Sequence, residues 1–494
     1  MSMLVVVIAV RSYPGAKAAI LQALHEADGI ELRLDYAPHL DLDAITALRT
    51  MCTCPIIFTL RSRAQGGQYP KTEAERVQDL HRLAALNPDY FDLEADMPTD
   101  AVMAIHTAYP QVKLICSYHN FRETPVDLMA LFESLHHPDF HAYKLACFAQ
   151  SGLDALRMLD FMQSLSASQH VSGFCMGEDG VSTRILSPVV GGFMNYCHLA
   201  SAEAIAPGQM TTTALLTQYH YRNLNRDTKF YALLGDPVEK SVGHIAHNQA
   251  ITILQKNAVY IKLRIPAALL PQAIAWCRSL NFQGLSVTMP LKEAIVPLLD
   301  KLDDEVTLIQ AVNTVVRDQK QFVGKNTDGL GAMQALSTAV DISKQTILLL
   351  GAGGAARAIA FTALAQGAQV IIVNRTVEKA QHLAKTLGCR AGSFSDLTQL
   401  QATVVINTLP EEAITPRLLE SLQQGFKPNM VVMDVVYQPI ETVLLRQAKQ
   451  AQCHCVYGYD MYVFQALLQI KHWFQPQEEE LEKIKARLLQ QFFE

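Results

Sequence analysis

Eight short apolar stretches, separated by segments long enough for a helix, run through the first 210 residues and constrain the fold more than any other feature. Strands that alternate with helices in this way build a parallel sheet. Such a sheet either closes into a (β/α)8 barrel or stays open and doubly wound, so an α/β fold of one of these types is predicted. The first seven predicted strands are 4–10, 30–35, 55–60, 90–95, 112–117, 142–146 and 171–176, and an eighth is predicted near 195–200.

The rest of the chain changes character three times. Residues 211–228 are polar and lack a strand pattern, so they are interpreted as a linker. A second α/β region covers 229–330, and a third, 331–475, opens with the strand–turn–helix pattern "TILLLGAGGAARAIA". The tail, 476–494, reads as a charged amphipathic helix, which either packs on the surface or serves as an interaction helix.

Composition excludes several classes of protein. Half of the 494 residues are hydrophobic and the net charge is −6, so the chain can bury large cores, and no basic block indicates nucleic acid or an anionic membrane. The apolar run 3–10 is too short to span a bilayer and lacks the flanks of a signal peptide. The C-x-C pairs among the ten cysteines do not match zinc spacing, so a cytoplasmic protein with reduced thiols and no metal is expected. The oligomeric state stays open, a monomer included.

Polar side chains stand near the ends of the predicted strands of the first region, where barrel enzymes carry their catalytic groups. Any one of them is readily explained as a rim residue or half of a structural ion pair, but the whole set favours an active site. The set comprises Glu31, Arg33, Asp35, Arg61, Asp92, Glu94, Asp96, His119 and Lys144.

Lys144 is the most informative of these residues because it stands in the otherwise apolar run "FHAYKLACF" (140–148). A desolvated amine that loses its proton attacks a ketone and forms an imine, which acidifies the neighbouring C–H. A histidine can take that proton and hand it to a leaving hydroxyl. Arginines such as Arg33, Arg61 and Arg184 can clamp a carboxylate. The residues therefore predict imine-assisted elimination, or aldol-type cleavage, of a small anionic keto acid.

An ordered series of motifs over residues 1–210 resembles type I 3-dehydroquinate dehydratase. It consists of "ELRLD" (31–35), "FTLRSRAQGG" (58–67), "SYHNF…TP" (117–125), "YKLA" (143–146), "GVSTR" (180–184) and "APGQ" (206–209). The resemblance implies a (β/α)8 barrel, an imine between Lys144 and dehydroquinate, and His119 as general acid and base. It assigns substrate binding to Glu31, Arg33, Arg61, Arg184 and Gln209.

Two residues depart from that family. Gln65 stands where the family has a glutamate that orients the histidine, and a neutral amide stabilises an imidazolium less well. Ile205 stands where the family has a hydroxyl residue. A working dehydratase that is slower or shifted in its pH dependence is therefore expected.

A nucleotide site is predicted in the third region. Gly351, Gly353 and Ala356 form G-x-G-x-x-A directly after a strand and at the start of a helix, where a pyrophosphate can approach the backbone closely. The next strand, 368–373, is followed by "NRT" without an acidic residue for a ribose hydroxyl, and its arginine can hold a 2′-phosphate. The pattern favours NADP.

A second pocket for a small acid is predicted upstream. "GLSVTMPLK" (284–292), "AVNTV" (311–315) and "GKNTDG" (324–329) place polar groups at strand ends, which suits a polyhydroxylated ligand. Lys292 and Asp328 can form a polar pair at the carbon that accepts hydride, where an ammonium polarises a carbonyl or passes on a proton.

These pieces, with "GDPVEKSVGHIAHN" (235–248), "VVYQP" (435–439) and "GYDMYVFQA" (458–466), resemble shikimate dehydrogenase over 229–475. The resemblance implies a substrate-binding subdomain and a C-terminal Rossmann subdomain, with the last helices packing back on the former. It assigns catalysis to Lys292 and Asp328. It assigns the shikimate pocket to Ser241, Ser286, Thr288, Asn313, Asp328, Tyr437 and Gln465. It assigns NADP binding to Gly351, Ala352, Gly353, Gly354, Ala355, Asn374, Arg375, Thr376 and Gly458.

Here too the motif departs from the family. Gly243 replaces a serine whose hydroxyl would bind the substrate carboxylate, so a raised KM for shikimate is expected. Ser286 replaces the commoner asparagine, and a serine can still hydrogen-bond a substrate hydroxyl.

The whole chain resembles the bifunctional dehydroquinate dehydratase/shikimate dehydrogenase family, in the domain order of the plant enzymes. The implied reactions are dehydration of 3-dehydroquinate to 3-dehydroshikimate and NADPH-dependent reduction to shikimate, which are steps toward chorismate and the aromatic amino acids. Two alternatives remain: a dehydrogenase half that also accepts quinate, and a half retained only as a binding module.

Overall fold

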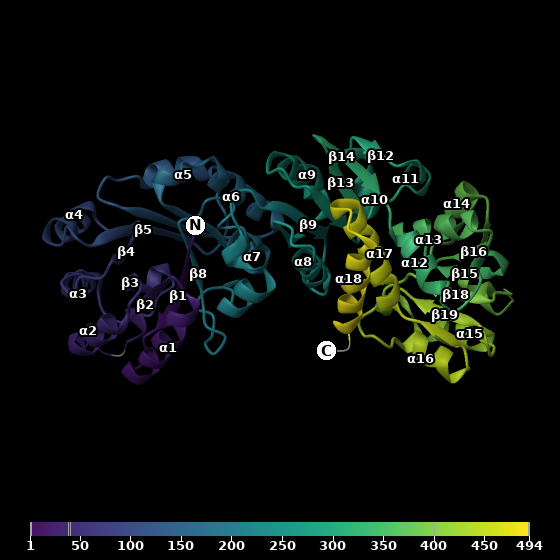
Figure 1. Cartoon of the computed structure of the whole chain (residues 1–494), viewed down its shortest axis with the longest axis horizontal. Coiled ribbons are helices and arrows are strands. Elements are labelled where there is room, and N and C mark those ends of the chain that lie inside the picture. Colours follow the sequence, from purple (N-terminus) through teal and green to yellow (C-terminus); the bar gives the residue numbers. More distant parts are fainter. Residues whose placement is uncertain (1, 38, 40, 400, 493–494) are drawn as a thin grey trace. The chain divides into compact units, whose positions relative to one another are not determined.

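The computed structural model of the chain describes residues 2–37, 39, 41–399 and 401–492 (Figure 1). The chain forms two compact units. One contains the residues up to Lys229 together with Asn257–Ile265 and Gln272–Asn281. The other contains Phe230–Lys256, Pro266–Pro271 and the residues from Phe282 onward. No helix in the described part of the chain combines the length and hydropathy needed to span a bilayer.

The first unit is built on eight parallel strands in the order β7-β6-β5-β4-β3-β2-β1-β8. Their bounds are β1 Met3–Ala9, β2 Gly29–Arg33, β3 Ile56–Thr59, β4 Tyr90–Glu94, β5 Lys113–Asn120, β6 Ala142–Phe148, β7 Val171–Met176 and β8 Met194–Cys197. The backbone amide of Phe193 donates to Val171 O at 2.8 Å, and that of Met194 donates to Ser172 Oγ at 2.9 Å. These contacts bring the two outer strands together. The nearly closed barrel confirms the first of the two predicted sheet types.

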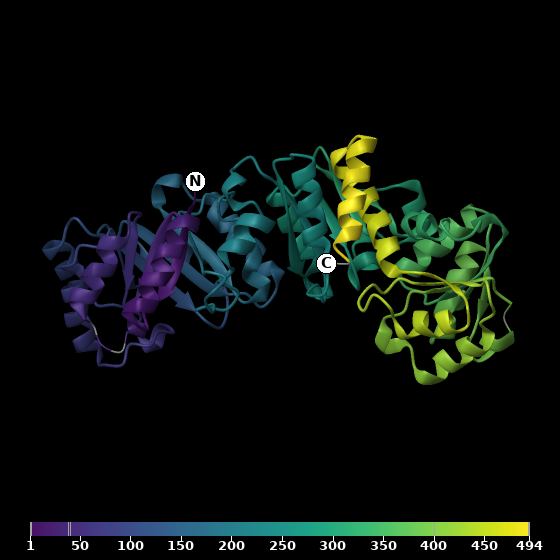
Figure 2. The same ribbon diagram turned by 60° about the horizontal axis from the view of Figure 1, so that its bottom comes forward.

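Helices cover the outside of the barrel (Figures 1 and 2). They are α1 Tyr13–Glu26, α2 Leu42–Met51, α3 Glu73–Ala84, α4 Thr99–Ala108, α5 Leu128–Leu135, α6 Gly152–Ser164 and the short α7 Val181–Ile185. Alternate strand residues point inward, where Val5, Ile57, Ala142 and Ala146 share one buried cluster. Since side chains alternate along a strand, Lys144 lies on the same inward face as Ala142 and Ala146. The barrel interior, rather than the helix layer, therefore receives the lysine.

The predicted linker packs against the first unit instead of running free. It contains two short helical turns, Ala214–Gln218 and Tyr221–Asn223, and it buries Leu215, Tyr221 and Leu224. Arg222 also pairs with Asp28 at 2.6 Å. A few apolar residues in a mainly polar segment are enough to hold it in place, and composition alone does not show this.

A six-stranded mixed sheet follows, in the order β10-β9-β11-β13-β14-β12. Strands β9 and β11 pair in parallel, whereas β11, β13 and β14 pair antiparallel. The strands are β9 Lys229–Gly235, β10 Ala258–Arg264, β11 Gly284–Val287, β12 Lys301–Leu302, β13 Thr314–Asp318 and β14 Gln321–Lys325. The helices between them are α8 Gly243–Ile253, α9 Leu270–Ser279, α10 Leu291–Ala294 and α11 Asp304–Ile309.

The last sheet is wholly parallel, in the order β17-β16-β15-β18-β19-β20, which is the doubly wound order of dinucleotide-binding domains. Its strands are β15 Thr346–Leu350, β16 Gln369–Val373, β17 Arg390–Gly392, β18 Val404–Asn407, β19 Val431–Asp434 and β20 His454–Val456. The accompanying helices are α12 Asp328–Leu336, α13 Gly354–Ala365, α14 Val377–Leu387, α15 Pro416–Gly425 and α16 Val443–Gln450. Buried apolar clusters lie on both faces, which confirms the Rossmann prediction.

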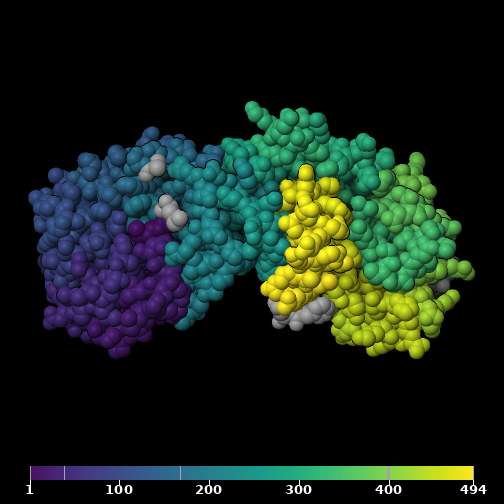
Figure 3. Space-filling model, in the orientation of Figure 1, coloured from purple at the N-terminus to yellow at the C-terminus, as the bar shows by residue number. Residues whose placement is uncertain are grey.

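Two C-terminal helices complete the second unit. Helices α17 (Gly458–Phe474) and α18 (Glu478–Gln490) lie side by side (Figures 1 and 2). Ile484 and Leu488 of α18 are fully buried in a cluster with Ala246 and Ala250 of α8 and Ala466 of α17. The yellow C-terminal segment lies at the surface of the second unit (Figure 3), and Glu478, Glu479, Glu482 and Lys483 of α18 are exposed. After the Rossmann sheet, the described C-terminal residues therefore pack against α8.

Candidate active sites

A cavity opens at the carboxyl ends of the barrel strands, where barrel enzymes carry their active sites. It has a volume of about 60 Å³ and is partly open to solvent. The cavity brings together all seven residues predicted for the dehydratase half. They are Glu31, Arg33, Arg61, His119, Lys144, Arg184 and Gln209, and Gln65 and Ile205 line it as well.

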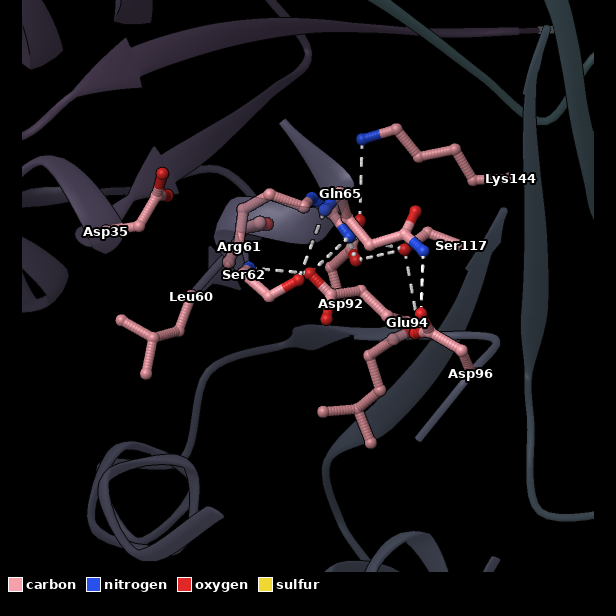
Figure 4. Close-up of polar contacts among 12 residues, drawn as sticks. Asp35, Leu60, Arg61, Ser62, Gln65, Asp92, Glu94, Asp96, Ser117 and Lys144 are labelled. Carbon is pink, nitrogen blue, oxygen red and sulfur yellow. Dashed lines mark hydrogen bonds and ion pairs between the residues drawn. The ribbon is translucent and has the colours of Figure 1, made fainter. Parts of the chain in front are cut away.

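Lys144 projects from β6 into this cavity with a side chain only 7% exposed. Its Nζ lies 3.4 Å from Asp92 Oδ2 (Figure 4). It also lies 3.4 Å from Glu31 Oε1 and 3.8 Å above the ring centroid of Tyr196. Two carboxylates hold the ammonium.

Arg61 also pairs with carboxylates, and it shares Asp92 with Lys144. Its guanidinium lies 2.8 Å from Asp92 Oδ1 and donates to Ser117 Oγ at 2.7 Å (Figure 4). Burial alone would raise the pKa of Asp92, but the charges of Arg61 and Lys144 outweigh it and hold the pKa well below its usual range. Arg33 is likewise held, by both oxygens of Asp35 at 2.8 and 2.9 Å.

Arg184 differs from the other two arginines because it forms no ion pair among the described residues. Its side chain is 1% exposed, donates to Tyr196 O at 3.1 Å and lies 4.3 Å from the ring centroid of Phe174. Burial lowers its pKa to about 10, so it remains a cation at neutral pH. A buried, unbalanced guanidinium that lines a cavity suits an anionic ligand such as a carboxylate.

His119 lies at the end of β5, stacked on Phe121 with ring centroids 6.0 Å apart. Burial lowers its pKa well below the ordinary value, and the cations Arg61 and Lys144 lower it further. The imidazole is therefore neutral at physiological pH and able to accept a proton. Gln209, which was predicted to bind substrate, here accepts a hydrogen bond at its Oε1 from the Ile205 amide at 2.9 Å. This bond shapes the loop at the cavity rim.

The second site is centred on an ion pair between Lys292 of α10 and Asp328 at the start of α12, with Nζ 2.6 Å from Oδ2. The amide of Asn313 donates to Asp328 Oδ1 at 2.8 Å and lies 3.4 Å from Gln465 Oε1 of α17. Four predicted residues from four segments therefore meet at one point.

Gln469 is a residue of this site that sequence reasoning missed. Its Oε1 accepts from Ser286 Oγ at 2.9 Å, and its Nε2 donates to Asn313 O at 3.0 Å and Thr314 Oγ1 at 2.9 Å. The side chain is 2% exposed. One signal was present: Gln469 follows Gln465 by four residues, so both lie on the same face of α17.

The remaining residues of the predicted pocket lie near the start of α8 and the end of β11. Ser241 hydrogen-bonds Tyr437 and accepts from the Gly243 amide at 3.2 Å. Thr288 directly follows β11, and its backbone amide donates to Leu234 O at 2.9 Å. Gly243 thus lies beside Ser241, at the position where the motif lost a hydroxyl.

The glycine-rich turn between β15 and α13 fits a dinucleotide. Gly351 has φ +114°, a conformation that favours glycine, and a Cβ there would collide with Thr408 Oγ1. At Gly353 a Cβ would meet no atom within 4 Å, so space is open in front of the helix start. Ala352, Gly354 and Ala355 complete this turn. A phosphate could approach these backbone amides closely.

The other predicted cofactor residues lie beyond β16 and at the start of α17. Asn374 Nδ2 donates to Thr376 O at 3.0 Å and shapes this turn, while Arg375 and Thr376 are exposed. Gly458 starts α17, where a Cβ would collide with Val436 O. The residues present therefore fit a nucleotide whose phosphate lies near Arg375.

Sequence models of three protein families match the chain. The type I 3-dehydroquinase family matches residues 4–226. The shikimate dehydrogenase substrate binding domain matches residues 233–315, and the shikimate/quinate 5-dehydrogenase family matches residues 333–437.

Relatives align along most of the chain. The shikimate biosynthesis protein AroDE of Chlamydia pneumoniae is 35% identical over 465 residues, covering 94% of this chain and 93% of that protein. The chloroplastic bifunctional 3-dehydroquinate dehydratase/shikimate dehydrogenase of Arabidopsis thaliana is 33% identical, covering 90% and 77%. The crystal structure of shikimate dehydrogenase from Aquifex aeolicus is 31% identical with a TM-score of 0.50, covering 54% of this chain and 99% of that one. The chain therefore belongs to the family of bifunctional proteins that join a type I 3-dehydroquinate dehydratase to a shikimate dehydrogenase.

Proposed function

We propose that the chain catalyses two consecutive reactions of the shikimate pathway. The barrel removes water from 3-dehydroquinate to give 3-dehydroshikimate, and the second site reduces this ketone to shikimate with NADPH. One observation carries the proposal above all. A single cavity holds a buried amine, a histidine kept neutral by burial and a guanidinium free of any described carboxylate.

In the dehydration, the substrate carboxylate pairs with Arg184, and the Lys144 amine attacks the ketone carbon. Loss of water gives the protonated imine, which acidifies the adjacent C–H. His119 removes that proton and returns it to the hydroxyl on the next carbon, which leaves as water. Hydrolysis of the imine then frees Lys144 and the product.

In the reduction, NADPH supplies a hydride to the carbonyl carbon when it is bound. Lys292 and Asp328 hold the carbonyl oxygen and supply the proton that completes the hydroxyl. Asn313 orients Asp328 by its 2.8 Å hydrogen bond, and Gln465 lies 3.4 Å from the same Asn313 amide. Arg375 is assigned to the 2′-phosphate and Ser241, Thr288 and Tyr437 to the substrate.

A coupled assay tests the proposal. With 3-dehydroquinate and NADPH supplied together, shikimate should accumulate in step with NADPH loss. Borohydride added with 3-dehydroquinate should attach the substrate's mass to Lys144, and Lys144→Met should abolish both the adduct and the dehydration. An unchanged intact mass of the wild-type chain would refute the dehydratase assignment. Oxidation of quinate with NADP⁺ at a rate comparable to shikimate would broaden the second activity.

A further inference from the structure

Gln65 connects an acidic residue at the cavity rim to the interior of the dehydratase cavity. It ends the short helical turn Arg63–Gln65 that follows β3. Its Nε2 donates to Asp96 Oδ2 at 2.8 Å (Figure 4). Its other amide atom, Oε1, is buried and has no hydrogen-bond partner among the described residues. Because the NH₂ group must face the carboxylate, the amide is fixed with its oxygen turned away from Asp96.

His119 offers the donor that this oxygen lacks. Its Nδ1 is also buried and without a hydrogen-bond partner among the described residues, and it lines the same cavity as Gln65. The Ala95 amide donates to Ser117 O at 2.9 Å, so the chain leading to Asp96 runs alongside the end of β5. Buried polar atoms are nearly always paired in folded proteins. A hydrogen bond from Nδ1–H to Oε1 would satisfy both atoms at once.

We propose that Asp96 is a positioning residue of the dehydratase, which acts through the Gln65 amide to keep the proton of neutral His119 on Nδ1 and so leave Nε2 as the base. The inference rests on the proposed function, because it gives His119 the proton-transfer role.

The charges around His119 show why such a residue is needed. Arg61, Lys144 and Arg33 face it with positive charge, and Asp92 is the carboxylate that opposes them. Once His119 has taken the substrate proton, it is a cation among cations. Asp96 polarises the Gln65 amide toward the imidazolium and supplies a further negative charge one side chain away. Since Asp96 reaches solvent, its contribution is smaller than that of a carboxylate in direct contact.

Asp96→Asn tests the relay, with Asp100→Asn as the matched control. Asp100 lies four residues further along the chain, in the first turn of α4, where it is exposed and does not line the cavity. We expect Asp96→Asn to lower the dehydratase kcat roughly tenfold with little change in KM. The acidic limb of its kcat–pH profile should move, because the protonated form of His119 is no longer stabilised by the negative charge of Asp96. Asp100→Asn should do neither.

The double variant Gln65→Glu/Asp96→Asn separates a relay from a structural role. A carboxylate at position 65 contacts the histidine directly, so kcat should return to the wild-type value or above it. Equal kcat and equal pH profiles for Asp96→Asn and Asp100→Asn, or no recovery in the double variant, would overturn the inference.

Borohydride trapping on Lys144 distinguishes this failure from failure of the proposed function. Trapping should proceed in Asp96→Asn as in wild type, since imine formation precedes the proton transfer. If the wild-type chain is not trapped, the dehydratase assignment itself is wrong, and the inference falls with it.

Discussion

Lys292 Nζ lies 2.6 Å from Asp328 Oδ2, while Asn313 occupies the other oxygen of the same carboxylate at 2.8 Å. Both oxygens of Asp328 are thus engaged, and the ammonium is held in one place before any substrate arrives. A charge that is already in place at the reacting oxygen stabilises the negative charge that develops there in the transition state. We therefore expect Lys292→Met to slow the turnover of the ketone reduction by about 10²-fold or more.

That loss should be specific to the reduction. NADPH oxidation measures it, and the dehydratase rate of the same protein should stay at the wild-type value. Lys385→Met, which removes an exposed lysine on α14, is the control and should leave both rates unchanged. A Lys292→Met reduction rate near that of the control would contradict the role of the pair.

Gln469→Leu should weaken both the fold and the second site. The change removes the hydrogen bonds of Gln469 to Ser286 Oγ, Asn313 O and Thr314 Oγ1, and also its hydrogen bond to His247. We expect the free energy of unfolding of the second unit to fall by about 1–3 kcal/mol. The KM for the ketone substrate should rise, because Ser286 and Asn313 are no longer fixed. Urea unfolding and initial rates measure these effects, and Gln423→Leu at an exposed position of α15 is the control.

Arg375→Gln should weaken NADPH binding selectively. The exposed guanidinium follows β16 and is assigned to the 2′-phosphate, which NADH lacks. We expect the KM for NADPH to rise about tenfold or more while the KM for NADH changes little. Arg446→Gln on α16 removes an exposed arginine elsewhere and should affect neither cofactor. Equal losses for the two cofactors would show that Arg375 does not read the phosphate.

Gly243→Ser should lower the KM for shikimate several-fold, because the new hydroxyl can add one hydrogen bond to the substrate. The new hydroxyl would stand beside Ser241, whose Oγ already accepts from the amide of residue 243. The KM for NADP⁺ serves as the internal control and should not move. An unchanged KM for shikimate would mean that this position does not contact the substrate carboxylate.

His247 should make the stability of the second unit depend on pH. Burial lowers the pKa of His247 to about 4, although hydrogen bonds to Gly243 and Gln469 oppose this. Above about pH 6.5 the imidazole is neutral both folded and unfolded and contributes no pH dependence. Between about pH 6.5 and 4 the unfolded chain binds a proton that the folded chain does not. Stability therefore falls as the pH falls, by up to about 1.4 kcal/mol per pH unit.

Unfolding in urea across the range from neutral to mildly acidic pH measures this dependence. The ring centroids of Trp473 and His247 lie 5.4 Å apart, so the fluorescence of Trp473 follows the local transition. A Trp276→Phe background removes the other tryptophan of the chain. In His247→Gln the fall with decreasing pH should be smaller than in the parent. Parallel curves for the two proteins would show that His247 is not the group responsible.

The strands could be predicted because apolar runs of strand length are a local property of the sequence. All eight barrel strands overlap their predicted stretches, but β5 extends to Asn120 because His119 and Asn120 pair with Ala146 and Cys147 of β6. Pairing with a distant strand decides where a strand ends, and the local pattern does not contain it.

The residue types of both sites could be predicted, but their pairing could not. Lys144 was found from its unusual setting, and its alternation with Ala142 and Ala146 explains why it faces the cavity. That its ammonium meets Glu31 and Asp92 depends on how Arg61 and Arg33 are already partnered. Gln469 was missed because a glutamine in a helix carries no signal until the segments that it bonds are brought together.

The packing of residues 211–228 has a practical consequence for isolating the two activities. A fragment that stops at residue 210 would omit Leu215, Tyr221 and Leu224, whose side chains are 1%, 2% and 4% exposed in the intact chain. The apolar surface they cover would then face water and promote aggregation. A dehydratase expressed alone should therefore carry this polar segment to its end, because the segment packs as a part of the first unit rather than acting as a tether.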